Sequence, residues 1–117
     1  MKLTILDRII IMQILPAESD ISTLRIVRDM KKKLGFSTEE TEKFNIKNIV
    51  EPNTGRSSIT WDAKAMTEEV DIKLVRVERE IIINAIDELD KKKKALEIHI
   101  DIYDKVKNFN EEVEKQG

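Results

Sequence analysis

The segment Leu3-Thr4-Ile5-Leu6-Asp7-Arg8-Ile9-Ile10-Ile11-Met12-Gln13-Ile14-Leu15 decides the fold, because nine of its thirteen residues are Leu, Ile or Met. The Asp-Arg pair in its middle and the lack of a small-x-small cleavage site after it argue against a signal peptide. A membrane span needs about 20 apolar residues, so the segment is also too short to cross a bilayer. We therefore expect a core helix of a cytoplasmic protein, ended by Pro16 because the residue before a proline avoids the helical region.

Two further helices are expected in residues 1–45, which form an N-terminal helical block. The first begins at an Asp20 N-cap, carries apolar residues at intervals of three and four, and ends at Gly35. The second opens on a capping box formed by Ser37 and Glu40 and runs toward Phe44.

Residues 46–74 have the character of a small β element. Two β-branched stretches, around residues 46–50 and 57–62, flank a run of turn formers that includes Pro52 and Gly55. This pattern is typical of a β-hairpin. Apolar and charged residues alternate over 70–74, which predicts a third strand.

Residues 75–113 are predicted to form a second helical block. Apolar residues at helical spacing define its first helix: Val77, Ile81, Ala85 and Leu89, widened by Ile82 and Ile86. The next segment alternates like a strand over 96–102, but its four-three spacing continues for 19 residues, from Ala95 to Val113. That length favours a helix. Residues 114–117 are expected to be a frayed tail.

Together these elements predict a single domain over residues 1–117, of a mainly helical α+β class. It would consist of N-terminal helices, a small antiparallel hairpin or three-stranded element, and two C-terminal helices. The side chains expected in its core are Leu6, Ile10, Ile14, Leu24, Val27, Leu34, Phe36, Trp61, Ile81, Ala85, Leu89, Ile102 and Val106.

Composition excludes several classes of functional site. The chain has no cysteine and one histidine, His99, which excludes disulfides, cysteine nucleophiles and multi-histidine metal centres. Its three glycines are isolated from one another, so no Gly-rich phosphate loop can form. We therefore expect a non-enzymatic protein with no catalytic residue, no metal site, no cofactor and no small-molecule substrate.

Nucleic-acid binding is an alternative reading of the element order. Three helices followed by a hairpin is the order of a winged helix, and residues 34–37 could form the turn of a helix-turn-helix. However, the expected recognition helix over 37–44 carries three glutamates and one lysine. Its net negative charge would be repelled by DNA phosphates. The 21 basic and 23 acidic residues of the chain also provide no overall positive field.

A protein contact has the stronger physical basis in the sequence. The helix expected over residues 3–15 is apolar almost all round, so it must be covered on more than one side. If the rest of this small domain does not cover it, the remaining surface would contact a protein partner or a second copy of the chain. The apolar residues at four-three spacing from Ala95 to Val113 could pack within the chain or against a second copy. The candidate interface residues are Ile5, Ile9, Ile11, Met12, His99, Ile102, Val106 and Phe109.

Several segments also carry a resemblance to other sequences. They are residues 3–16, 24–27 and 33–40, the single Trp61, and the late series Leu89, Asp90, His99 and Tyr103. With these features the chain resembles short uncharacterised proteins encoded by tailed phages and prophages. The resemblance implies an accessory, assembly or host-directed protein acting in the bacterial cytoplasm. It implies no functional residues, because that group has no established activity.

Overall fold

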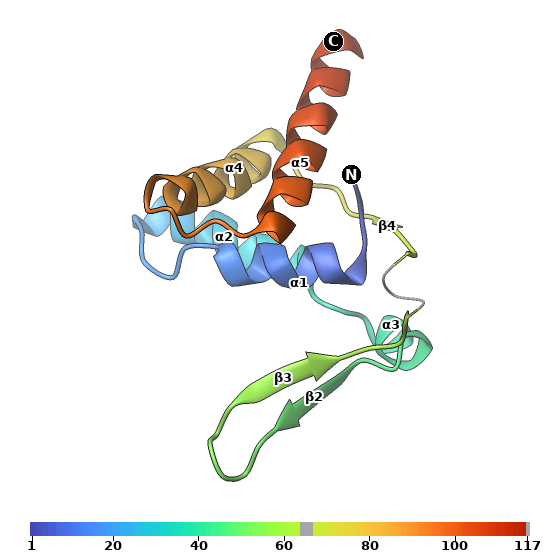
Figure 1. Cartoon of the computed structure of the whole chain (residues 1–117). Coiled ribbons are helices and arrows are strands. Elements are labelled where there is room, and N and C mark those ends of the chain that lie inside the picture. The colour runs from blue at the N-terminus through green and yellow to red at the C-terminus, as the bar shows by residue number, and fades with distance from the viewer. Residues whose placement is uncertain (64–66, 117) are drawn as a thin grey trace.

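A computed structural model of the chain describes residues 1–63 and 67–116, with side chains described up to Val113. The described residues form five helices and four short strands, so the chain has the mainly helical α+β fold predicted from the sequence (Figure 1). The elements in chain order are β1 (Lys2–Leu3), α1 (Ile5–Ile14), α2 (Ile21–Leu34), α3 (Thr38–Lys43), β2 (Lys47–Val50), β3 (Ser57–Thr60), β4 (Val70–Asp71), α4 (Arg76–Lys91) and α5 (Glu97–Gln116).

Side-chain caps fix the starts of the first three helices. The backbone N–H of Asp7 donates to Thr4 Oγ1 at 3.1 Å, and Thr4 N–H donates to the Asp7 carboxylate, which completes a capping box for α1. Asp20 caps α2 and Ser37 caps α3, which confirms both predicted starts. At the other end of α2, Gly35 N–H donates to the Lys31 carbonyl at 3.0 Å.

The strands form two separate antiparallel pairs. One is the predicted hairpin, in which β2 pairs with β3. The predicted third strand is present as β4, but it pairs with β1, with Leu3 opposite Val70. The Met1 ammonium donates to Asp71 Oδ1 at 2.7 Å and to the Ile72 carbonyl at 3.0 Å, which ties the chain start to β4. No three-stranded sheet therefore forms in the described residues, and α1 begins after β1.

The core lies between α1, α2, α4 and α5. Its fully buried members include Ile11, Met30, Leu34, Ile82 and Val106. Of the residues expected in the core, five are buried and eight are partly buried. The buried five are Ile10, Val27, Leu34, Ile102 and Val106, and the other eight are Leu6, Ile14, Leu24, Phe36, Trp61, Ile81, Ala85 and Leu89.

Helix α4 buries part of its predicted apolar face. Ile82 and Ile86 lie in the core, and Ile81, Ala85 and Leu89 are partly buried. Ile83, which was not predicted, is also buried, whereas Val77 is 44% exposed. Helix α5 confirms the helical interpretation of the segment after Ala95. It runs through Gln116, so residues 114–116 of the expected frayed tail are helical, and Gly117 lies outside the described residues.

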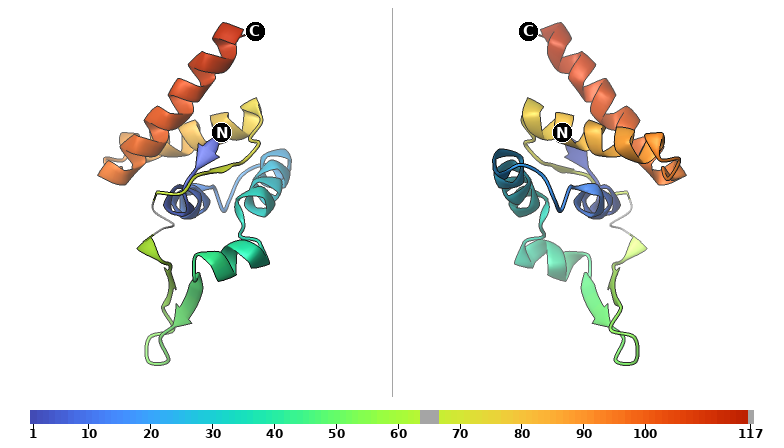
Figure 2. Two further views of the ribbon diagram at one scale, coloured as in Figure 1. Left: turned by 90° about the vertical axis from the view of Figure 1, so that its right-hand side faces the viewer. Right: turned by 90° about the vertical axis from the view of Figure 1, so that its left-hand side faces the viewer.

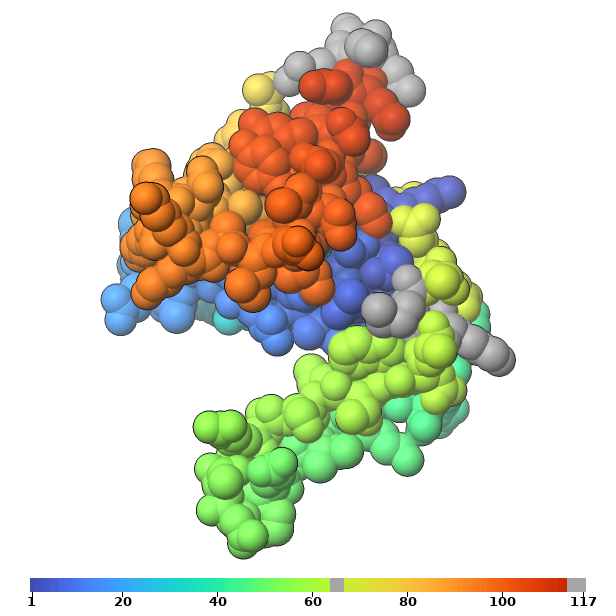
Figure 3. Space-filling view, viewed as in Figure 1, coloured from blue at the N-terminus to red at the C-terminus, as the bar shows by residue number. Residues whose placement is uncertain are grey.

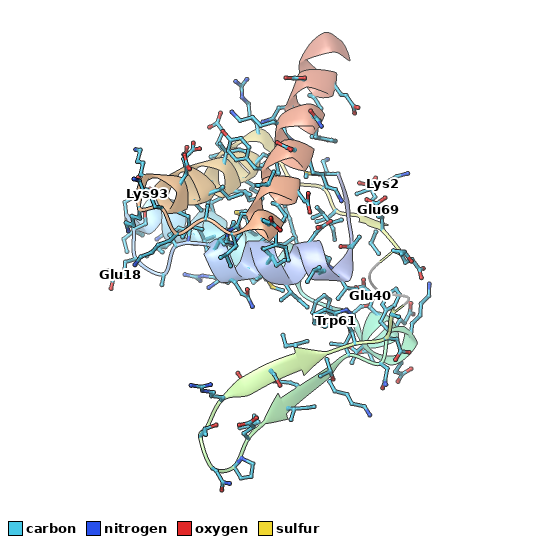
Figure 4. All side chains as sticks on the ribbon, viewed as in Figure 1. Lys2, Glu18, Glu40, Trp61, Glu69 and Lys93 are labelled. Carbon is cyan, nitrogen blue, oxygen red and sulfur yellow. The ribbon has the colours of Figure 1, made fainter. Side chains whose placement is uncertain are left out.

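The hairpin projects from the rest of the fold, as two further views show (Figure 2). We call residues 47–60 the arm, and we call α1, α2, α4 and α5 with the β1–β4 pair the helical body. A second, smaller cluster lies near the base of the arm, where Ile5, Ile9 and Phe44 are buried and Phe36, Ile46 and Trp61 pack against them (Figure 4). This cluster covers the side of α1 that the main core leaves open.

Candidate functional site

The candidate interface residues lie in the interior of this chain. Six of them are buried: Ile5, Ile9, Ile11, His99, Ile102 and Val106. The other two, Met12 and Phe109, are partly buried against the main core. The chain itself therefore provides the cover that α1 and α5 need, which leaves these candidates little surface for a partner. The reason is that α1 is covered twice, by the main core on one side and by the Phe44 cluster on another.

His99 has a local structural role at the start of α5. Its Nδ1 accepts a hydrogen bond from the Leu96 backbone N–H at 2.9 Å, and the His99 backbone N–H donates to the Leu96 carbonyl at 2.9 Å. The imidazole thereby takes up a backbone donor that the helix leaves unpaired at its N-terminus. Only 7% of the residue is exposed.

Arg8 is a buried charge that joins three helices, a role that was not predicted from the sequence. It is 1% exposed, and its guanidinium donates to the Leu34 carbonyl at 3.1 Å, to the Gly35 carbonyl and to the Glu40 carboxylate. It also lies over the Phe36 ring, 4.7 Å from the centroid. The sequence did carry a signal for this role, since Arg8 lies in the middle of an apolar segment. A cation that is buried with its segment requires a hydrogen-bonding or anionic partner.

Glu40 serves the same junction from α3. Its Oε1 accepts the Ser37 backbone N–H at 3.1 Å as part of the α3 capping box. The hydrogen bond from Arg8 is the main reason that the pKa of the Glu40 carboxyl lies below its ordinary value. One carboxylate thus caps α3 and neutralises the buried Arg8.

Glu78 and Arg79 occupy a second polar junction, at the start of α4. Glu78 Oε1 accepts the Val75 backbone N–H at 2.9 Å and the Lys33 ammonium at 2.7 Å. Arg79 donates to the Leu74 carbonyl and to Asn110 Oδ1, both at 2.6 Å. Among the described side chains, no buried nitrogen or oxygen lacks a hydrogen-bond partner. These charges therefore hold elements of the fold together.

An open groove of about 730 Å³ crosses the body between the end of α1, the start of α2, and α4. Its lining includes the apolar residues Ile14, Pro16, Ile81, Leu89 and Leu96, with Glu88 and Lys92 among its charged members. In the described part of the chain, no group of three or more acidic or histidine side chains is placed to hold a metal ion. The groove is thus an apolar recess without a cluster of ligands.

The arm is the most exposed regular element of the fold. All eight strand residues are exposed, including Ile49 at 46%, Val50 at 59% and Ile59 at 39%. In the space-filling view the tip of the arm stands apart from the helical body (Figure 3). The β-branched pattern predicted the strands correctly, but it did not predict that both faces of the hairpin would stay in solvent.

The backbone pairing of the arm determines which polar groups remain free. Glu51 N–H donates to the Arg56 carbonyl at 2.9 Å, which places these two residues at a hydrogen-bonded position of the ladder. The return bond is replaced by turn contacts, because the Glu51 carbonyl accepts Gly55 N–H and Arg56 N–H donates to Thr54 Oγ1. Antiparallel ladders alternate bonded and non-bonded pairs. The pairs 49/58 and 47/60 are therefore hydrogen-bonded pairs, whereas 48/59 and 50/57 are non-hydrogen-bonded pairs. The N–H and C=O groups of Asn48 and Val50 consequently point outward from the free edge of β2.

Comparison with known proteins gives no family assignment: no family model, no curated protein and no solved structure matches this chain. Within the residues that the structure describes, no helix combines the length and apolar character that crossing a membrane requires.

Proposed function

We propose that this chain is a non-enzymatic protein-interaction module in which the helical body carries the arm as its contact element. One observation carries the proposal: every strand residue of the arm is exposed, including Ile49, Val50 and Ile59. An isolated two-stranded hairpin is marginally stable in water, and its unpaired edges are templates for another strand. Peptide recognition by strand addition uses such an edge.

The groove on the helical body is a weaker candidate for the same role. Its apolar lining is continuous with the core, and the residues that form it also pack α1 against α4. Among the described residues, the strand side chains of the arm bury nothing of the core, so their apolar members are better explained by a contact. A role as a phage accessory or assembly protein in the bacterial cytoplasm stays a prediction from the sequence resemblance.

A shortened arm provides the test of this function. Because 47 and 60 form a hydrogen-bonded pair, an Asn-Gly turn can replace residues 48–59 and close the hairpin at its base. Circular dichroism of this variant is expected to show the helical content of the body. Affinity capture from a bacterial extract and sedimentation at high protein concentration would then compare it with the intact chain.

We expect the intact chain to bind a protein partner or itself and the shortened chain to bind neither. Ile21→Ser is the matched control, since Ile21 is an exposed apolar residue of the body, 67% accessible, and its loss should leave binding unchanged. Binding that survives arm shortening would contradict the proposal, and so would an intact chain that binds no protein and stays monomeric.

Nucleic-acid binding through a winged-helix arrangement is the competing proposal. Helix α3 has no buried residue and exposes Glu39 and Glu42 close to the base of the arm, which disfavours approach of a phosphate backbone. A gel-shift assay with duplex DNA over a salt series distinguishes the two functions. Affinity that falls steeply with salt and requires the arm would favour the nucleic-acid function.

A further inference from the structure

The free edge of β2 has a charge pattern that is complementary to itself. Side chains alternate between the two faces of a strand, so Lys47, Ile49 and Glu51 share one face. If a second β2 lies antiparallel to the first with the two Ile49 residues opposite each other, each Lys47 lies opposite Glu51 of the second copy. The chain thus carries a cation and an anion at equal distances on either side of one apolar residue.

The backbone of this edge fits the same register. The outward groups of β2 belong to Asn48 and Val50, and this register places each Asn48 opposite Val50 of the second copy. Each such pair can exchange both N–H···O bonds. The Ile49–Ile49 and Lys47–Glu51 pairs then fall at non-hydrogen-bonded positions, where opposing side chains are closest. Backbone and side chains therefore favour a single register.

We propose that two copies of this chain associate through β2 to form a four-stranded antiparallel sheet in the order β3–β2–β2–β3. The proposal rests on the proposed function, because it names a second copy as the partner of the arm. The dimer is isologous, as closed two-fold assemblies of identical chains are. In Figure 1 the strand β2 forms the side of the arm that faces away from α1, which leaves this edge accessible to a second copy.

The Lys47 ammonium and the Glu51 carboxylate, which this register pairs, are not held in ion pairs within the described chain. Among the described residues, Lys47 makes no ion pair, and Glu51 takes its side-chain hydrogen bond from Thr54 Oγ1 at 3.0 Å. The free edge of β3 lacks the same complementarity. Its outward residues are Ser57 and Ile59, and pairing centred on Ser58 would place Arg56 opposite the uncharged Thr60. We therefore assign the contact to β2.

A charge swap tests the contact directly. Lys47→Glu places like charges opposite each other at both ends of the paired strands, and Glu51→Lys does the same. Since opposite-charge cross-strand pairs stabilise and like-charge pairs destabilise, each single reversal is expected to weaken dimerisation by about tenfold. The double variant Lys47→Glu with Glu51→Lys restores the pairs and should recover the original affinity. Sedimentation equilibrium from micromolar to millimolar protein measures these constants.

Two single proline substitutions, one in β2 and one in β3, show which edge of the hairpin forms the contact. Val50→Pro removes an outward N–H of β2, whereas Ser57→Pro removes an outward N–H of β3 at the opposite position of the same pair. Neither substitution removes a bond of the hairpin ladder, so circular dichroism should be unchanged for both. We expect dimerisation to be lost in Val50→Pro and kept in Ser57→Pro.

Three outcomes would overturn the contact through β2: an intact chain that stays monomeric at millimolar concentration, a double swap that does not rescue the singles, or a dimer that is lost in Ser57→Pro and kept in Val50→Pro. If self-association fails while the arm still captures a different protein, the proposed function stands and only the identity of the partner is wrong. If both fail, the arm is not a contact element.

Discussion

The helical body and the arm are stabilised in different ways. In the body, α1, α2, α4 and α5 bury one another's apolar side chains, and the buried Arg8, Glu78 and Arg79 have hydrogen-bond partners. In the arm, backbone pairing joins β2 to β3 while all strand side chains face solvent. Substitutions in the body should therefore change stability, and substitutions in the arm should change association.

The largest effect is expected in the main core. Ile82 is fully buried, so Ile82→Ala should lower the free energy of unfolding by about 2–5 kcal/mol through lost burial and a cavity. Urea unfolding followed by circular dichroism measures the change. Ile100→Ala in α5 is the matched control, because Ile100 is exposed and its truncation should cost less than about 0.5 kcal/mol. Equal effects at the two positions would contradict the assignment of the core.

The next effect is expected at the Arg8 junction. Arg8→Ala removes the donors to the Leu34 and Gly35 carbonyls and leaves Glu40 without its cation. Because hydrogen bonds to charged groups contribute about 1.5–3 kcal/mol, we expect a loss of roughly 2–3 kcal/mol in the free energy of unfolding. Arg8→Lys should recover only part of the loss, since an ammonium cannot form the same fork. Full recovery by lysine would show that charge alone matters there.

A smaller effect concerns acid stability. The folded-state pKa of Glu40 lies below its ordinary value because Arg8 donates to the carboxylate. The corresponding stabilisation is complete above the pKa that the Glu40 carboxyl has in the unfolded chain, and it is lost as the pH falls through the lower folded-state pKa. The difference in unfolding free energy between the native chain and Glu40→Gln should thus be constant near neutrality and shrink in acid. A difference that does not vary with pH would refute this linkage.

The smallest effect on stability is expected in the arm. Ile49→Ala removes an exposed side chain, so the unfolding free energy of the dilute protein should change by less than about 0.5 kcal/mol. The same substitution should weaken self-association, because Ile49 is the central pair of the proposed dimer. Thermal unfolding at low concentration and sedimentation at high concentration separate the two readouts. A large loss of stability in the dilute protein would mean that the arm belongs to the core.

Local signals in the sequence predicted most elements of this fold. Capping residues such as Asp20 and Ser37 act within one turn of a helix, so their effect can be read from neighbouring positions. The pairing of β1 with β4 could not be read this way, because it joins Leu3 to Val70 across most of the chain. The burial of Ile83 on α4 was also missed, since this residue lies outside the predicted apolar face of the helix.

The candidate site was harder to predict than the fold. An apolar segment predicts burial, but it does not say whether the chain itself or a partner provides the cover. Here Phe44 and its neighbours complete the cover of α1, and they do so through contacts distant in sequence. The exposure of Ile49 and Ile59 depends equally on tertiary structure, because in the part of the chain that the structure describes the strands of the arm stay exposed on both faces.

Amide hydrogen exchange of the arm, measured residue by residue by NMR at low and high protein concentration, tests the central claim most directly. In dilute solution the outward amides of Asn48 and Val50 should exchange rapidly. At high concentration both should become protected, while the outward amides of Ser57 and Ile59 and the amides of the body should not change. Exchange at Asn48 and Val50 that is independent of concentration, or protection that appears on β3 instead, would contradict the account.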